Sequence, residues 1–214
     1  MGDPGNVLVL AAKEEGIFLV SDAMATAGSD IDPDGQHIWA IDRCGANSCA
    51  GSDLDPILKI DPDGNVVATM GAGLFLFPHG MHVDRDGNVW VTDAQGPNRD
   101  NPATAGKGHV VIKLSPDGEV LLTLGRPGSP GDGRGALLNT PCDVVTDADG
   151  NIYVVGAQEY EPSTEFNRAG YQEKNILTPF SGVKKYSADG EYLGTTMSYS
   201  RAREDHIKCT LRKI

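Results

Sequence analysis

The segment from Phe75 to Asp93 combines a histidine suited to metal binding with the start of a repeated structural unit. His79 stands in a Phe-Pro-His-Gly-Met run that leads into an Asp-Gly turn. Imidazole is a frequent zinc ligand, and a zinc ion at this place would act as a Lewis acid. A catalytic zinc site usually needs three protein ligands, which one histidine does not supply. His79 is therefore either a metal ligand that requires partners or a histidine that only lines a pocket.

The four cysteines match neither paired Cys-x-x-Cys motifs nor the spacing of a zinc finger. They are Cys44, Cys49, Cys142 and Cys209. Cys44 and Cys49 are close enough in sequence to close a small disulfide loop, which would require an oxidising compartment. Two free thiols are an equal alternative at this stage.

Short runs with the alternation of β-strands recur along the chain, each bounded by an Asp-Gly turn, a strong local signal for a hairpin. Three turns lead into a strand with a central aromatic residue (Trp39, Trp90 and Tyr153), which we expect in the blade core, and the next turn in each case follows a strand that contains lysine. Their glycines are Gly35, Gly87 and Gly150 for the first type, and Gly64, Gly118 and Gly190 for the second. One turn of each type makes a four-stranded meander, so the repeat is typical of propeller blades.

These repeats predict an all-β protein, a β-propeller of four-stranded blades with about three to four blades present. Apolar runs at residues 7–10 and 16–20 could supply part of a further blade. We expect residues 1–196 to form a partial propeller domain. Residues 197–214 lose the repeat, turn basic and form a divergent tail.

Two insertions have the composition of loops and are expected on one rim of the propeller, residues 94–108 and 157–180. The glycine-rich segment 127–135 lacks the Gly-Lys-Ser/Thr ending of a phosphate-binding loop and is interpreted as a connection between blades. An incomplete ring leaves sheet edges open. Such edges can pair with another molecule, so the chain is expected to self-associate.

The composition limits the classes of partner. The formal net charge is −12 and the sequence pI is about 4.7, which disfavours nucleic acid and anionic membranes, because both attract basic surfaces. No apolar run approaches the ~20 residues that span a bilayer, and the first residues lack the basic region of a signal peptide. The compartment stays unknown.

The repeat resembles the six-bladed propellers with NHL-type repeats and, within them, the peptidyl-α-hydroxyglycine α-amidating lyases. The resemblance runs from about residue 29 to about residue 195. It is carried by Ile41-Asp-Arg-Cys-Gly45, Asp55-Pro-Ile-Leu-Lys-Ile-Asp-Pro62, the Phe77-to-Asp93 segment, His109-Val-Val-Ile-Lys-Leu114 and Asn139-Thr-Pro-Cys-Asp-Val-Val-Thr-Asp147.

This resemblance implies a zinc-assisted lyase that cleaves a carbon–nitrogen bond of a peptide or small amide substrate and releases a peptide amide and glyoxylate. It implies a catalytic zinc ion on three histidines and a structural calcium ion. His79 matches the first zinc ligand, Met81 a position whose backbone carbonyl binds calcium, and Arg43 the active-site arginine that holds the substrate carboxylate. Tyr160 is a weaker match to the catalytic tyrosine.

The chain also departs from the family pattern, because the second and third zinc histidines belong to later blades that it lacks. His82, His109 and His206 are not in the ligand positions of the family, although His206 in the tail could approach the axis. Arg43 could instead pair with Asp42 or Asp53. The alternative function is a non-catalytic propeller that binds a peptide or protein on one rim, or a truncated, inactive relative of the lyases. The family is often secreted.

Overall fold

The computed structural model describes residues 9–13, 16–20, 26–131, 135–156 and 182–197. It contains three four-stranded antiparallel sheets, each a meander in chain order. The first comprises β3 (Thr26–Ile31), β4 (Ile38–Asp42), β5 (Ile57–Ile60) and β6 (Val66–Met70), and the second β7 (Pro78–Val83), β8 (Val89–Asp93), β9 (Val110–Leu114) and β10 (Val120–Gly125). The third comprises β11 (Pro141–Thr146), β12 (Ile152–Gly156), β13 (Gly182–Tyr186) and β14 (Tyr192–Met197).

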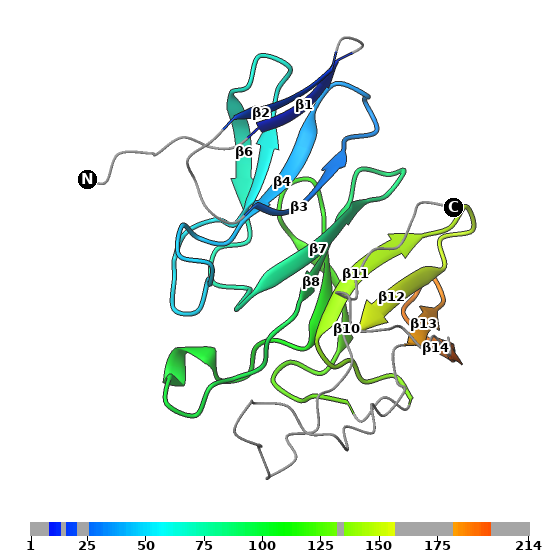
Figure 1. Cartoon of the computed structure of the whole chain (residues 1–214). Helices are drawn as coiled ribbons and strands as arrows, with labels where there is room; N and C mark the ends of the chain where they lie inside the picture. The colour runs from blue at the N-terminus through cyan, green and yellow to red at the C-terminus, as the bar shows by residue number, and fades with distance from the viewer. Residues whose placement is uncertain (1–8, 14–15, 21–25, 132–134, 157–181, 198–214) are drawn as a thin grey trace, which may run out of the picture.

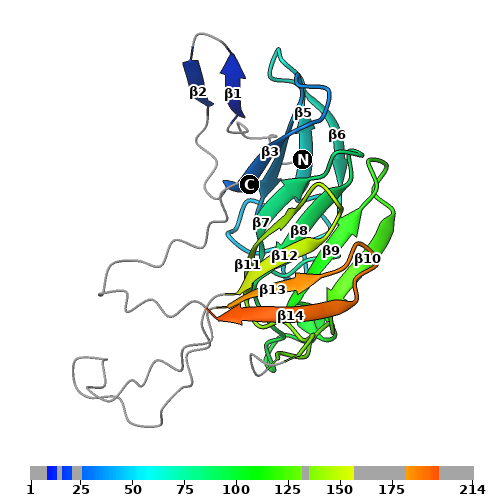
Figure 2. The same cartoon turned by 90° about the vertical axis from the view of Figure 1, so that its right-hand side faces the viewer.

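The sheets are arranged as successive propeller blades, so the predicted all-β propeller is confirmed (Figures 1 and 2). The first strand of each sheet lies innermost, and β7 packs against both β3 and β11. A separate hairpin of β1 (Val9–Lys13) and β2 (Gly16–Val20) precedes the first blade. The described part of the chain therefore holds three blades and one hairpin, as the repeat count predicted.

Apolar side chains fill the two spaces between the blades. One cluster of buried residues, including Trp39 and Val91, lies between the first and second blades. A second cluster, including Trp90 and Val144, lies between the second and third. Burial of apolar surface is the main stabilising contribution to such a fold, so each blade depends on its neighbour.

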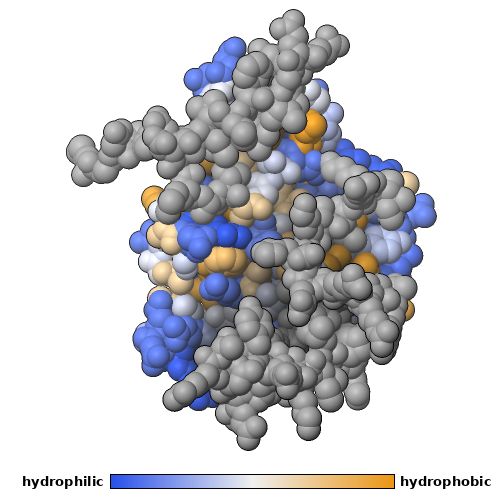
Figure 3. Space-filling view, in the orientation of Figure 1, coloured by the Kyte–Doolittle hydropathy of each residue, from blue (hydrophilic) through white to orange (hydrophobic). Residues whose placement is uncertain are grey.

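The two rims of the propeller differ in the length of their connections. Each of the six predicted Asp-Gly turns is present, and its glycine has a positive φ between 70° and 88°. These tight turns lie at one rim, whereas the long connections leave the opposite rim, where the inner strands begin (Figure 1). The insertion at residues 94–108, which includes the short helix η1 (Pro102–Thr104), is on the long-loop rim. Its surface is hydrophilic (Figure 3).

An aspartate, a tryptophan and a lysine form the same unit in the first two blades. In the second blade, the indole nitrogen of Trp90 donates to Asp84 (3.0 Å), and the Lys113 ammonium lies 3.3 Å from the same carboxylate oxygen and 4.9 Å from the indole ring. Burial opposes ionisation of Asp84, but hydrogen bonds from Trp90 and Asn88 outweigh it and lower the pKa of the carboxyl. The turn is thus joined to the core of the blade.

Replacement of Asp84 by alanine is expected to lower the free energy of unfolding by about 2–4 kcal/mol, because it leaves the buried indole donor without its acceptor. The matched control is Asp61→Ala. Asp61 closes a similar turn by accepting from the amides of Asp63 and Asn65 and from the Asn65 side chain, but it has no tryptophan or lysine partner among the described residues. Urea denaturation of both variants measures the difference, and equal losses would contradict the role assigned to the unit.

In the third blade, Tyr153 takes the place of the tryptophan and donates to Asp147 (3.0 Å). Trp39 and Trp90 are fully buried, as expected for blade core, but Tyr153 is only partly buried. The reason is its position, since each aromatic residue of this series faces the following blade and no further blade is described beyond the third.

Several predictions concern parts of the chain that the structure does not describe. The second insertion (residues 157–180) and residues 198–214 of the basic tail lie outside the described residues. The boundary between domain and tail and the expected self-association stay predictions. Among the described residues, no helix is long and apolar enough to cross a membrane.

Candidate functional site

His79 lies in a β-bulge near the start of the inner strand β7. Between Pro78 and Met81, β7 has one more residue than the facing part of β8. A bulge increases the local twist and re-aims the side chains of the strand. The amide of Gly80 donates to the hydroxyl of Thr92 (2.8 Å), so this buried donor is satisfied despite the irregular ladder.

The imidazole of His79 is oriented by the neighbouring blade. Its Nδ1 lies 3.1 Å from the carbonyl oxygen of Cys142 in β11. Because a carbonyl only accepts, this contact places the proton on Nδ1 and leaves the lone pair on Nε2. No described residue bonds to Nε2, and the ring is half-buried. His79 therefore presents an acceptor that a metal ion or a ligand hydroxyl could use.

Gly80 allows the two inner strands to come this close. A Cβ atom at this position would overlap the carbonyl group of Cys142, the same group that binds His79. On the other side of β7, the Cβ of an added side chain at Gly28 of β3 would lie only 3.2 Å from the carbonyl oxygen of His79. The glycine in the Pro-His-Gly motif is thus required by the packing that orients the histidine.

Arg43 follows β4 directly and extends toward the start of β7. Its Nε donates to the carbonyl of Pro78 (2.9 Å), its Nη1 donates to the side-chain oxygen of Asn47 (2.8 Å), and its guanidinium carbon lies 3.8 Å from the centroid of the Phe77 ring. Burial lowers the pKa of Arg43, but an arginine stays protonated in proteins. A cation is therefore fixed beside the residue that precedes His79.

No carboxylate balances this charge within the described structure. The expected pairing of Arg43 with Asp42 or Asp53 is wrong, because neither lies within ion-pair distance and the partners of the guanidinium are neutral. Phe77 flanks both candidate groups, since its ring centroid is also 6.2 Å from that of His79. The site thus combines a cation that has no ion-pair partner in the described part of the chain with a nearby acceptor nitrogen.

A buried carboxyl group organises the segment that carries these residues. Asp93 at the end of β8 is fully buried and accepts hydrogen bonds from the amides of Leu76 (3.0 Å) and Phe77 (2.7 Å). Burial raises the pKa of Asp93 to about 6, although the two amides and Lys107 act in the opposite direction. Asp93 thus fixes the backbone that leads into His79, while its own carboxyl group is buried.

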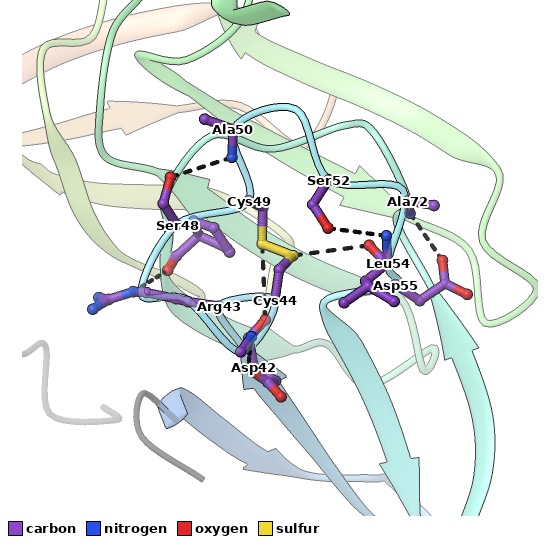
Figure 4. The surroundings of a disulfide bond; sticks show 12 residues. Asp42, Arg43, Cys44, Ser48, Cys49, Ala50, Ser52, Leu54, Asp55 and Ala72 are labelled. Carbon is purple, nitrogen blue, oxygen red and sulfur yellow. Dashed lines mark hydrogen bonds between the residues drawn. A yellow bond between two sulfur atoms is a disulfide. The ribbon is translucent and has the colours of Figure 1, made fainter. Parts of the chain in front are cut away.

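The Cys44–Cys49 disulfide is present, which decides between the two alternatives left by the sequence (Figure 4). Its loop joins β4 to β5 at the long-loop rim, directly after Arg43. Cys142 is buried and takes no part in the disulfide, and its thiol donates to the carbonyl oxygen of Thr140 (3.5 Å).

The described residues do not supply a complete zinc site. No three histidine, cysteine, aspartate or glutamate side chains within them are grouped to hold a metal ion. His79 has the right tautomer for one ligand, but His82 is used elsewhere: it bridges Asp30 (3.1 Å) and Thr146 (2.9 Å) on the two flanking inner strands. Met81 is buried in β7, and its expected carbonyl contact with calcium stays a prediction.

Two further predicted residues, Tyr160 and His206, lie outside the described residues. No contact between His109 and His79 is found among the described residues. Its Nδ1 accepts from the amide of Thr140 (3.3 Å), and burial lowers its pKa. The structure therefore brings Arg43 and His79 together around Phe77 and leaves the other predicted groups apart or undescribed.

The sequence did not single out Phe77, Asn47 or Asp93 as parts of the site. Phe77 and Asp93 both belong to the segment from Phe75 to Asp93 that the sequence marked as informative. Asn47 had a weaker signal, as a residue tolerant of the left-handed conformation inside a short cysteine loop, where its φ is 54°.

Comparison with known proteins supports the resemblance stated from the sequence. The chain is 39% identical over 131 residues to peptidyl-glycine alpha-amidating monooxygenase B of Xenopus laevis, a match that covers 56% of this chain and 13% of that protein. It is 30% identical over 154 residues to a probable peptidyl-alpha-hydroxyglycine alpha-amidating lyase of Caenorhabditis elegans, covering 72% of this chain and 39% of that protein. The chain thus spans well under two thirds of these relatives.

No protein-family model matches the chain. Among solved structures, that of U3-55K aligns with 91% of this chain and 43% of its own, with a TM-score of 0.49 and 10% identity. Further similarity is to peptidyl-alpha-hydroxyglycine alpha-amidating lyase 1 of Drosophila melanogaster, at 35% identity over 97 residues. The described residues form three blades of a β-propeller, and the resemblance of the chain to the peptidyl-α-hydroxyglycine α-amidating lyases is confirmed by its sequence relatives.

Proposed function

We propose that this chain binds the α-hydroxyglycine end of a peptide or small amide and takes part in its cleavage to an amide and glyoxylate. The observation that carries the proposal is the guanidinium of Arg43, which is fixed beside the Phe77–His79 segment and has no ion-pair partner among the described residues. A carboxylate is the group that a planar guanidinium binds best, through two parallel hydrogen bonds. The proposed substrate ends in such a carboxylate.

His79 supplies the second contact that this substrate needs. The carbinolamide carbon bears a hydroxyl group next to the carboxylate, and the free Nε2 acceptor of His79 suits that hydroxyl or a metal ion bound to it. Cleavage requires the hydroxyl proton to leave as the carbonyl of glyoxylate forms, while the amide nitrogen gains a proton. Zinc would favour the deprotonated hydroxyl, and His79 could serve as one of its ligands, but one described histidine does not make a zinc site.

The test is release of glyoxylate from a benzoyl-α-hydroxyglycine substrate by the purified chain, at several zinc concentrations. We expect release that is lost in His79→Ala. The matched control is His37→Ala, which removes a histidine of a tight turn at the opposite rim. Release that is independent of His79, or no release at any zinc concentration, would contradict the proposed function.

The second candidate is a non-catalytic propeller that binds a peptide on the long-loop rim. It is favoured by the absence of a three-ligand metal group among the described residues. It predicts that a peptide ending in a carboxylate binds with the same dependence on Arg43 but is not cleaved. Measured binding without glyoxylate would select this function.

A further inference from the structure

We propose that the Cys44–Cys49 disulfide and Asn47 position Arg43 for carboxylate binding, so that the anion site depends on the intact bridge. The identity of the ligand as a carboxylate rests on the proposed function. The positioning of Arg43 itself rests on the contacts of the described loop and is tested separately below.

Arg43 stands at the start of the disulfide loop, directly before Cys44 (Figure 4). The carbonyl oxygen of Arg43 accepts from the amides of Ala46 and Ser48 (both 3.2 Å). Its side chain is held by Asn47, which lies between the two cysteines. Asn47 and Cys44 both have a φ of 54°, a conformation that non-glycine residues adopt infrequently. The bridge holds the loop in a shape that the free chain disfavours, and that shape places the Asn47 side chain against the guanidinium.

The same loop is anchored to the backbone before His79. Cys49 is only 4% exposed, its amide donates to the carbonyl of Leu76 (2.9 Å), and the Ser48 hydroxyl lies 3.3 Å from the same oxygen. Leu76 is in turn bound through its amide to the carboxyl of Asp93. Hydrogen bonds therefore connect the loop and Arg43 with the segment that leads into His79. The disulfide closes the loop, which is the part of this unit without regular secondary structure.

An opened bridge would release the ring residues while leaving the blade intact, because the loop lies outside every strand. Arg43 would then lose the fixed acceptor at Asn47, so its Nε–H bond to Pro78 would be the one hydrogen bond left to hold the guanidinium and would open more often. The binding of a carboxylate would then have to order the Arg43 side chain again, and this loss of conformational entropy lowers the affinity. We expect carboxylate binding to weaken roughly three- to tenfold for one such side chain.

The primary measurement is the ¹⁵N NMR signal of the Arg43 Nε–H group, assigned by its loss in Arg43→Lys. In the oxidised protein this proton, bonded to Pro78, is expected to exchange slowly with water. Dithiothreitol transfers two electrons and two protons to the bridge, giving two thiols and the cyclic disulfide of the reagent. Faster exchange is expected after this reduction and in Cys44→Ser/Cys49→Ser, with a parallel titration of glycolate showing the weaker binding.

Asn47→Gly provides a variant that keeps the disulfide and suits the positive φ, so it tests positioning even where the double serine variant does not fold. Ser52→Ala, in the same loop but without contact to Arg43, is the control. Exchange and glycolate affinity that are unchanged on reduction and in Asn47→Gly would overturn the proposal. Faster exchange without any glycolate binding, in either redox state, would support the positioning and reject the carboxylate site.

Discussion

Replacement of Arg43 by methionine is expected to weaken binding of glycolate, and of an α-hydroxyglycine substrate, by about 30- to 1000-fold. This corresponds to about 2–4 kcal/mol for the loss of a charged, partly buried donor to a carboxylate. Methionine keeps an apolar stem that can cover Phe77, so the packing of the site changes less than with alanine. Calorimetric titration and the dependence of glyoxylate release on substrate concentration measure the effect.

The choice of controls separates the charge of Arg43 from its structural contacts. Arg43→Lys keeps the charge but loses the planar fork that bonds to Pro78 and Asn47, so it should restore only part of the affinity. Arg85→Met removes an arginine at a tight turn, bonded to the carbonyl of Ala148, and should leave binding unchanged. An Arg43→Met variant that binds glycolate as the unmodified protein does would remove Arg43 from the site.

The architecture was predictable because the same local sequence motifs recur in each blade. An Asp-Gly turn is favoured where a glycine must have a positive φ, and the short apolar runs on each side have the length and composition of β-strands. Trp39 and Trp90 recur at one position of this repeat, which marked them as core. The unit formed by Asp84, Trp90 and Lys113 was not foreseen, since its members come from a turn and two different strands.

The site was predictable only in part, because its geometry depends on contacts between blades. The Pro-His-Gly motif identified His79, but the carbonyl that fixes its tautomer comes from Cys142, far along the chain. Likewise, the sequence could not decide between an ion pair and a free cation at Arg43. That outcome follows from Phe77 and Pro78 reaching the guanidinium across the blade boundary.

Asp93 is expected to make the stability of the protein fall as the pH rises from about 4 to about 6. Burial raises the pKa of this carboxyl from 3.8 to about 6, so within this range the folded state binds a proton that the unfolded state has lost. The contribution is complete below pH 4 and is lost as the pH rises through 6. Its upper limit is about 3 kcal/mol, from the displacement of the pKa.

The comparison that isolates Asp93 is with Asp93→Asn, whose amide stays neutral at every pH. The unmodified protein should be more stable than the variant at pH 4, and this advantage should shrink by up to about 3 kcal/mol by pH 7. Aspartates whose pKa values are lowered, such as Asp32 and Asp147, act at lower pH and are common to both proteins. Urea denaturation across this range measures the difference. A constant difference would mean that Asp93 stays ionised throughout, and the amides of Leu76 and Phe77 would then hold a carboxylate rather than a carboxylic acid at pH 4.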